Sequence, residues 1–309
     1  MIEKIKNEIH KIVIGHEELV DAMLMALLSE GHIFVEGLPG VAKTTAVNTL
    51  AKVLGFDFKR VQFTPDLLPL DITGNEILDL TKNSYKIKHG PIFTNLLLAD
   101  EINRAGAKVQ SALLEAMAEK QVTIGEKSFK LNDPFMVLAT ANPIDQEGTY
   151  NLPEASLDRF MLKINVGYNS IEEEFLIVKK VADKKFEKVE SIVSLEQFKQ
   201  MQQESLNIHI DDELLQYILE IIFATREPKK YGLDEYIEFG ASPRASIDLY
   251  KATKAHAYLQ GKDYATPYNV AKSAFMALRH RIKLTYKAKV EQIDADTIIE
   301  KILEKVIAP

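Results

Sequence analysis

The stretch of sequence that decides the fold reads Gly37-Leu38-Pro39-Gly40-Val41-Ala42-Lys43-Thr44-Thr45. The mostly apolar residues 32–36 before it suit a short buried strand, and residues 45–54 after it have helical character until Gly55. A loop of this kind points successive backbone N–H groups at a phosphate, and the helix N-terminus adds positive potential. The stretch predicts a phosphate-binding loop with a nucleoside triphosphate as its ligand, whereas an ordinary strand-to-helix turn has no need of the Lys-Thr pair.

The last residues of this loop have separate expected roles. Lys43 can reach the β- and γ-phosphates, and the Thr44 hydroxyl can hold Mg²⁺. Ala42 stands where the usual pattern has a second glycine, and its methyl group is tolerated there if the residue already has helical φ and ψ. All nine residues of the loop, 37–45, are therefore candidate nucleotide-binding residues.

A pair of carboxylates follows a second apolar run. Residues 95–99 lead directly into Asp100 and Glu101, which a parallel sheet would place at its carboxyl edge, beside the phosphate loop. Asp100 is the candidate ligand for Mg²⁺ and its waters, and Glu101 is the candidate to accept a proton from the attacking water. The alternative is a helix N-cap, because Asp-Glu before a helix such as 107–119 also neutralises the helix dipole.

A third strand, residues 135–140, leads into Asn142 and Pro143. The Asn142 amide is expected at the same edge of the sheet, where it would orient the lytic water or touch the γ-phosphate. An isolated Asn-Pro pair is otherwise a turn signal. Asn142 is nevertheless a candidate site residue, because it is the third polar group in succession at the end of a predicted strand.

Charge and composition limit the classes of partner. The 309 residues carry a formal charge of −7 and contain no cysteine, so there is no global basic field for nucleic acid and no thiolate metal site. The amino terminus lacks the apolar core of a signal peptide, and no apolar run is long enough to cross a bilayer. We expect a soluble, cytoplasmic protein without a membrane partner.

The three sites and the segments around them resemble the MoxR branch of the AAA+ ATPases. The matching segments are TPDLLP (64–69), GPIF (90–93), LADEINR (98–104), QSALLEAM (110–117), ATANP (139–143), LPEASLDRF (152–160) and GASPRA (240–245). Alanine at position 42 is usual in that family. Leu70 and Gly106 depart from it, since a small polar residue and a proline are common at these positions.

The resemblance implies an α/β fold, namely an AAA+ P-loop core whose parallel sheet is flanked by helices, followed by a C-terminal all-helical lid domain. We predict a nucleotide-binding domain at residues 1–184 and a lid at 185–309, divided near Lys184 in a charged stretch. The helices expected after the core strands are 172–182, 195–204, 212–225, 242–259, 267–280 and 295–306. Their apolar spacings are equally those of a plain helical core.

Two hairpins are predicted within the core, at residues 72–87 and 121–131. Both resemble inserts that face the pore of a ring in the family. The first carries Lys82, Lys86, Lys88 and His89, and the second Lys120, Lys127 and Lys130, which raises nucleic acid as a substrate. The alternative, which we favour, is that lysines on exposed strands prevent edge-to-edge aggregation.

Two arginines take their expected roles from the resemblance. Arg159 matches the arginine finger that reaches the nucleotide of the neighbouring subunit, although a local surface pair with Asp158 is the plain alternative. Arg244 follows the N-cap and first helical position at Ser242 and Pro243, and matches a second sensor of the γ-phosphate. An arginine at the positive end of a helix is disfavoured unless an anion lies nearby.

At the front of the chain, Ile14 and Gly15 match the family segment that packs against adenine. His16 and His32 carry no metal signal, and we interpret both as satisfied structural histidines.

Three classes of function remain open at this point. The resemblance implies ATP and Mg²⁺, a homo-oligomeric ring expected to be a hexamer, and a chaperone-like remodeller that assists maturation or metal insertion with a von Willebrand factor A domain partner. A nucleic-acid-translocating ring ATPase is the second class, against which the acidic charge argues. A nucleotide-gated binding switch is the third, against which Glu101 argues. The sequence does not name the client protein.

Overall fold

The computed structural model describes residues 1–38, 42–79, 84–142, 150, 152–182 and 187–309. The described chain forms two compact units, each assembled from separate segments. The first contains residues 1–23, 32–152 and 164–198, and the second contains residues 24–31, 153–163 and 199–309. The domain boundary predicted near Lys184 lies outside the described residues and stays a prediction.

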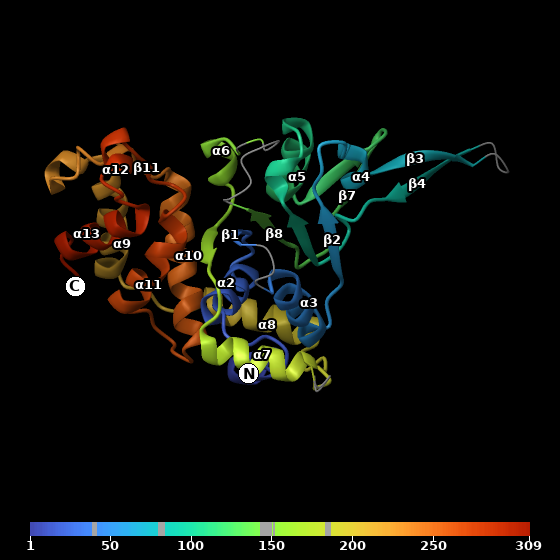
Figure 1. Ribbon diagram of the computed structural model, residues 1–309, viewed down its shortest axis with the longest axis horizontal. Helices are drawn as coiled ribbons and strands as arrows, with labels where there is room; N and C mark the ends of the chain where they lie inside the picture. Colours follow the sequence, from blue (N-terminus) through green and yellow to red (C-terminus); the bar gives the residue numbers. More distant parts are fainter. Residues whose placement is uncertain (39–41, 80–83, 143–149, 151, 183–186) are drawn as a thin grey trace. The chain divides into compact units, whose positions relative to one another are not determined.

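A five-stranded sheet in the order β2-β5-β8-β1-β9 forms the centre of the α/β fold (Figure 1). Its neighbours β2 and β5, β5 and β8, and β8 and β1 all pair in parallel. The strands are β1 (Ile33–Gly37), β2 (Phe58–Gln62), β5 (Leu96–Asp100), β8 (Met136–Ala141) and β9 (Leu162–Val166). Strands β1, β5 and β8 confirm the apolar runs predicted from sequence, and their parallel pairing brings the carboxyl ends of all three to one edge.

Helix α3 (Lys43–Leu54) begins where the phosphate loop ends and packs against β2 and β5. Its fully buried residues include Val47, Leu50 and Val53, and burial of each such side chain contributes about 1.5–3 kcal/mol. The helix ends at Gly55, whose φ of 64° suits glycine, as the sequence predicts. The other helices with residues in the first unit are α1 (Ile2–His10), α2 (Glu17–Leu28), α4 (Pro69–Thr73), η1 (Ile102–Arg104), α5 (Ala107–Glu119), α7 (Ile171–Ala182) and α8 (Leu195–Leu206).

Both predicted hairpins are present. Strands β3 (Gly74–Asp79) and β4 (Ser84–His89) pair antiparallel and extend away from the sheet, and β6 (Gln121–Ile124) pairs with β7 (Lys127–Lys130) (Figure 1). Lys86 and Lys88 are exposed on β4, and so is the apolar Tyr85, which is 70% exposed. The surface of this hairpin is therefore mixed rather than uniformly basic.

The second unit is mainly helical, as predicted for the C-terminal region. Helix α10 packs against α11 and α9, and α11 packs against α13. The cap predicted at the start of α10 is present, because the Ser242 hydroxyl accepts the Arg244 N–H. At the start of α11, Thr266 forms a capping box with Asn269. The helices are α6 (Glu154–Leu157), α9 (Asp212–Arg226), η2 (Pro228–Tyr231), α10 (Pro243–Leu259), α11 (Pro267–Leu278), α12 (Tyr286–Val290) and α13 (Ala295–Lys305).

A two-stranded ribbon that was not predicted from sequence lies in the same unit, where β10 (Ile237–Phe239) and β11 (Lys283–Leu284) pair antiparallel. Strands of three and two residues are too short to show an alternating pattern. The predicted lid is therefore helical with one short ribbon added.

The two histidines near the front of the chain differ. His32 is buried, its Nδ1 accepts the Val137 N–H at 3.0 Å, and its Nε2 donates to the Met117 carbonyl at 3.3 Å, which confirms a satisfied structural histidine. His16 is not satisfied in the same way, because its buried Nε2 has no hydrogen-bond partner among the described residues. That part of the prediction is wrong.

Burial makes folding stability depend on pH through His32. Desolvation lowers the pKa of His32 from 6.5 to about 4, so the unfolded chain binds a proton between these values and the folded chain does not. Stability is therefore complete above about pH 6.5 and falls as the pH decreases toward 4. At about pH 5 we expect a loss of about 2 kcal/mol from this group.

Urea unfolding at about pH 7 and about pH 5 checks this expectation. The variant His32→Gln, which does not titrate, should show a shallower loss of stability over the same window. Equal pH dependence in the two proteins would contradict the assignment to His32. Burial also lowers the pKa of His280 well below its ordinary value, so a residual dependence of the same sign should persist in the variant.

Candidate active site

A cavity of about 320 Å³ lies in the first unit, where the carboxyl ends of β1, β5 and β8 meet. It brings together most of the residues that the sequence singled out in three separate segments. Pro39, Gly40 and Val41 lie outside the described residues, and Leu38 is described but does not line the cavity. The lining residues are Gly37, Ala42, Lys43, Thr44, Thr45, Arg60, Asp100, Glu101, Thr140 and Asn142.

The two described ends of the phosphate loop have strict backbone requirements. A Cβ on Gly37 would lie 2.6 Å from the carbonyl oxygen of Val166, so only glycine fits at the end of β1. Ala42 has φ 56° and ψ 13°, which is the left-handed helical region. Ala42 is therefore helical, as its methyl group requires, but left-handed instead of right-handed. This conformation costs a residue with a Cβ about 1–2 kcal/mol. Strain of this kind is typical of ligand-binding loops.

Lys43, the first residue of α3, places a half-buried ammonium group beside the cavity. Its Nζ donates to the carbonyl oxygen of Gly37 at 2.8 Å. Burial lowers the pKa of Lys43, while Asp100 and Glu101 oppose this change by favouring the charged form. A bound polyphosphate would act in the same direction as the two carboxylates, so Lys43 gains electrostatic stabilisation from an anion in the cavity.

Both oxygens of Asp100 are engaged. Oδ2 accepts from Arg60 Nη2 at 2.6 Å and from Nε at 3.1 Å, and Oδ1 accepts from Thr140 Oγ1 at 2.6 Å. Arg60 is additionally positioned by Gln62, whose Oε1 accepts from Nη2 at 2.8 Å. These contacts fix the carboxylate at the end of β5 in one orientation.

Arg60 and Thr140 were missed as site residues. Arg60 lies on β2, where most side chains are polar and exposed, so no apolar run marked the strand. Only the pairing of β2 with β5, which sets Gln62 opposite Asp100, reveals that Arg60 reaches the cavity. Thr140 was recognised as the end of an apolar strand, and its position two residues before Asn142 was the signal that could have identified it.

Glu101 follows the last residue of β5 and no longer has an extended backbone. Its φ of 56° turns the chain, its N–H donates to Thr140 Oγ1 at 2.9 Å, and its Oε2 pairs with Arg104 Nη1 at 3.0 Å. It makes no side-chain cap bond to η1, and the N-cap of α5 is Gly106. The helix-cap alternative for the carboxylate pair is therefore wrong, and the Glu101 carboxylate lines the cavity instead.

Asn142 is half-buried and lines the same cavity, directly after β8. Ile14 and Gly15 are not among the lining residues. The Ile14 carbonyl accepts from Asn169 Nδ2 at 3.0 Å, and Gly15 has φ 69° with a Cβ position 2.4 Å from Glu173 Oε1, so only glycine fits there. Their expected contact with adenine stays a prediction.

The two arginines with expected roles toward the nucleotide lie in the second unit. Arg244 is in the first turn of α10, and its Nη1 pairs with Asp158 Oδ2 at 3.3 Å. Arg159 is exposed and follows Asp158, the C-cap of α6. The local pair between Asp158 and Arg159 is not formed, because the Asp158 carboxylate instead bonds to Ser242, Arg244 and Arg281. The roles of Arg159 and Arg244 toward ATP stay predictions.

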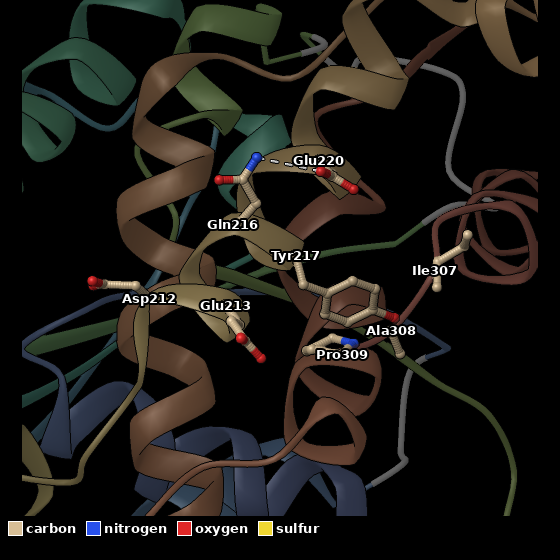
Figure 2. Close-up of a pocket in the computed structure, with 8 residues that line it drawn as sticks. All are labelled: Asp212, Glu213, Gln216, Tyr217, Glu220, Ile307, Ala308 and Pro309. Atoms are coloured by element: carbon tan, nitrogen blue, oxygen red, sulfur yellow. Dashed lines mark hydrogen bonds between the residues drawn. The ribbon is translucent and has the colours of Figure 1, made fainter.

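A second cavity, of about 380 Å³, lies in the second unit between α9 and the last residues of the chain (Figure 2). Three of its lining side chains are the carboxylates Asp212, Glu213 and Glu220, and Gln216 donates to Glu220 at 3.4 Å. Negative charges repel a triphosphate. This cavity therefore does not suit the nucleotide, whereas the cavity at the sheet edge presents Lys43 and the start of a helix.

Within the described part of the chain, no helix is both long and apolar enough to span a membrane.

Known proteins that match this chain give its family. Chaperone MoxR1 of Mycobacterium tuberculosis is 44% identical over 311 aligned residues, which cover 100% of this chain and 82% of that protein. The chain belongs to the MoxR family of AAA+ ATPases. The uncharacterised protein YeaC of Bacillus subtilis is 43% identical, with 100% of this chain and 95% of that protein covered.

Family models and a solved structure agree with this assignment. The model of the ATPase family associated with various cellular activities (AAA) matches residues 32–162, and the AAA lid domain model matches residues 231–302. A crystal structure of a Cytophaga hutchinsonii protein assigned as an ATPase superposes with a TM-score of 0.94 at 46% identity and covers 100% of this chain and 94% of that one. This MoxR-family chain is an ATPase with an AAA core and a lid.

Proposed function

We propose that this chain is a Mg²⁺-dependent, ring-forming ATPase that remodels other protein complexes as a chaperone. One observation carries the proposal, namely that a single cavity gathers the loop residues Lys43 and Thr44 with Asp100, Glu101 and Asn142 from the ends of two further strands. The relative named Chaperone MoxR1 supports the remodelling role.

The ligand set at the sheet edge fits Mg²⁺. The Thr44 hydroxyl and the Asp100 carboxylate are oxygen donors, which Mg²⁺ prefers, and it commonly takes one or two protein ligands together with phosphates and waters. When bound, Mg²⁺ would neutralise charge on the β- and γ-phosphate oxygens. Thr44 and Asp100 would hold it, and Lys43 would bind the same phosphates.

Hydrolysis needs a group that takes the proton from the attacking water. Glu101 lines the cavity one residue beyond Asp100, and its left-handed backbone directs it away from the line of β5. We assign it the role of general base, with Asn142 orienting the water. The Glu101 carboxylate also pairs with Arg104 Nη1 at 3.0 Å, which restrains its orientation.

Arg60 gives a prediction about the metal. Asp100 is the carboxylate proposed to hold Mg²⁺, and the Arg60 guanidinium occupies its Oδ2, so Arg60 competes with a cation for this oxygen. Arg60→Gln should lower the Mg²⁺ concentration that half-saturates ATP turnover by about two- to fivefold, the scale of a partly exposed ion pair. Turnover measured across a Mg²⁺ titration checks this.

Lys59→Gln is the matched control, because it removes the same charge from the neighbouring residue of β2, whose side chain points to the opposite face. It should leave the Mg²⁺ dependence unchanged. A lower turnover number in Arg60→Gln with unaltered Mg²⁺ dependence would mean instead that Arg60 contacts phosphate.

Several finer features remain proposals that rest on the family. These are a homo-oligomeric ring, a hexamer by expectation, in which Arg159 serves the neighbouring nucleotide, and Arg244 as a sensor of the chain's own γ-phosphate. A von Willebrand factor A domain protein as partner and a cytoplasmic location are proposed on the same basis.

The exposed lysines of the β3–β4 hairpin keep a nucleic-acid motor as the second candidate. The chain's charge of −7 and the exposed Tyr85 beside Lys86 favour the protein remodeller, so ATP turnover should not respond to DNA or RNA at physiological salt. A motor would contact several phosphates, and its stimulation would fall steeply with salt. Turnover measured with and without each polymer at two salt concentrations decides between them. Salt-sensitive stimulation that disappears on replacing Lys82, Lys86 and Lys88 would favour the motor.

A further inference from the structure

The turn between α11 and β11 carries an arginine, Arg281, for which no sequence motif predicts a role. Its side chain is 1% exposed, and each of its three nitrogens donates to the protein. Nε donates to Asp158 Oδ1 at 2.9 Å, Nη2 to Asp248 Oδ2 at 2.5 Å, and Nη1 to the Ala277 carbonyl at 3.1 Å. A guanidinium engaged on every nitrogen has one orientation.

Two further hydrogen bonds of Arg281 hold the main chain on both sides of Arg159, the candidate arginine finger. Nη2 also donates to the carbonyl oxygens of Asp158 and Phe160, each at 3.0 Å. These are the residues immediately before and after Arg159. The neighbouring His280 adds a bond from Nε2 to the same Phe160 carbonyl at 2.8 Å. The main chain on both sides of Arg159 is thus held from one turn, while the Arg159 side chain itself is exposed.

Asp158 continues this network to the start of α10. Its two carboxylate oxygens accept from the Ser242 hydroxyl, each at 2.9 Å, and Oδ2 pairs with Arg244 Nη1 at 3.3 Å. Ser242 is the N-cap of α10, and Arg244 lies in its first turn. Arg281, Asp158 and the first turn of α10 are therefore joined by direct hydrogen bonds and ion pairs.

We propose that Arg281 is a positioning residue that fixes the main chain around Arg159 and, through Asp158, makes this segment move together with Arg244. The inference rests on the proposed function, in which Arg159 serves the neighbouring nucleotide and Arg244 the chain's own. A displacement of α10 caused by one nucleotide would then be transmitted to the finger that acts on the next.

The variant Arg281→Lys tests the geometry with the charge retained. A lysine ammonium has three donors on one atom and cannot bind two carboxylates and the carbonyls of residues 158 and 160 together. Misplacement by about 1 Å can cost on the order of 10²-fold in rate, so we expect the turnover number to fall by about 10- to 100-fold. The KM for ATP and the affinity for a non-hydrolysable ATP analogue should stay unchanged, because the loop and Lys43 are untouched.

Arg279→Lys is the matched control. Arg279 lies in the same turn, is 8% exposed, forms a two-bond pair with Asp296 at 2.9 Å, and donates to the Lys163 carbonyl, four residues after Arg159. Its replacement reports the general effect of losing a buried arginine there. A fall in turnover as large as that of Arg281→Lys would overturn the positioning role.

Mixing subunits separates a misplaced finger from a damaged lid. A subunit with Arg281→Lys retains Glu101, so its own site should recover when a Glu101→Gln subunit next to it supplies an intact Arg159. Turnover per Arg281→Lys subunit should therefore rise at least severalfold as the catalytically inactive Glu101→Gln protein is added. A defect in Arg244 or in lid folding acts within the same subunit and gives no such rise.

The mixing experiment distinguishes a failure of the positioning role of Arg281 from a failure of the proposed ring ATPase function. Rescue of Arg159→Ala by Glu101→Gln without rescue of Arg281→Lys would reject the inference and leave the ring ATPase standing. Failure of both would reject the trans-acting finger. If Arg281→Lys does not unfold cooperatively, Asp248→Asn replaces it, because this variant weakens the ion pair of Arg281 with α10 but leaves Asp158, Ser242 and Arg244 unchanged. The same rescue is expected from it.

Discussion

Glu101→Gln should bind ATP as tightly as the parent protein and hydrolyse it about 10²- to 10⁴-fold more slowly, the range typical of a lost general base. The substitution keeps the volume of the side chain and leaves Lys43, Thr44 and Asp100 in place, so the contacts proposed for phosphate and Mg²⁺ are unaffected. The Arg104 ion pair that it weakens is partly exposed and contributes less than about 1 kcal/mol, so the fold should be unaffected. Phosphate release and binding of a labelled ATP analogue measure the two effects separately.

Two comparison variants make this result specific. Lys43→Ala should lose ATP binding itself, because it removes the ammonium that lies beside the cavity at the start of α3. Glu119→Gln, at the exposed end of α5, removes an equal charge away from the cavity and should behave like the parent protein. Ordinary turnover by purified Glu101→Gln would refute the assignment of the base.

The sequence predicted the parts of the fold whose signals are local. Buried parallel strands such as β5 and β8 are nearly continuous apolar runs, and each ends in the polar residues that define the cavity, Asp100 or Asn142. Helix ends were predictable where a cap exists, as at Gly55 and Ser242. These features depend on a few adjacent residues, so one sequence is enough to identify them.

The features of the site that the sequence did not predict depend on contacts between segments that are distant in the chain. Arg60 reaches Asp100 only because β2 lies beside β5, and β2 itself is too polar to be recognised. Arg281 meets Asp158 across 123 positions of the chain, and no periodic pattern records such a contact. The left-handed backbone of Ala42 and Glu101 is likewise set by the surrounding structure, because neither residue type favours it.

The assignment of chain segments to the two compact units could not be predicted from sequence for the same reason. Residues 24–31 and 153–163 belong to the second compact unit although they lie within the predicted nucleotide-binding domain. In the sequence they look like ordinary core segments, since Leu24 to Leu28 and Phe160 to Leu162 are apolar and buried. Composition identifies that such residues are buried but not which unit buries them.

Arg159→Ala should retain ATP binding and lose at least ~10³-fold in turnover, the scale of other arginine fingers. Three observations in the second unit favour a functional role for Arg159 over that of an ordinary surface residue. Its side chain is exposed, the carboxylate next to it is taken by Arg281 and Ser242, and the main chain on both sides is held by buried donors. A structural surface arginine has no need of such support, because exposed ion pairs contribute little to stability.

Mixed assemblies decide where Arg159 acts. Neither Arg159→Ala nor Glu101→Gln should turn over ATP efficiently alone, but at some interfaces of a mixed ring an intact finger meets an intact base. In a random mixture of equal amounts, each Glu101-bearing site has about an even chance of such a neighbour, so turnover should recover to about a quarter of the parent value per subunit. Recovery must depend on assembly and disappear on dilution below the concentration at which the ring forms. Assembled mixtures without recovery would show that Arg159 works within its own subunit or has no role in the chemistry.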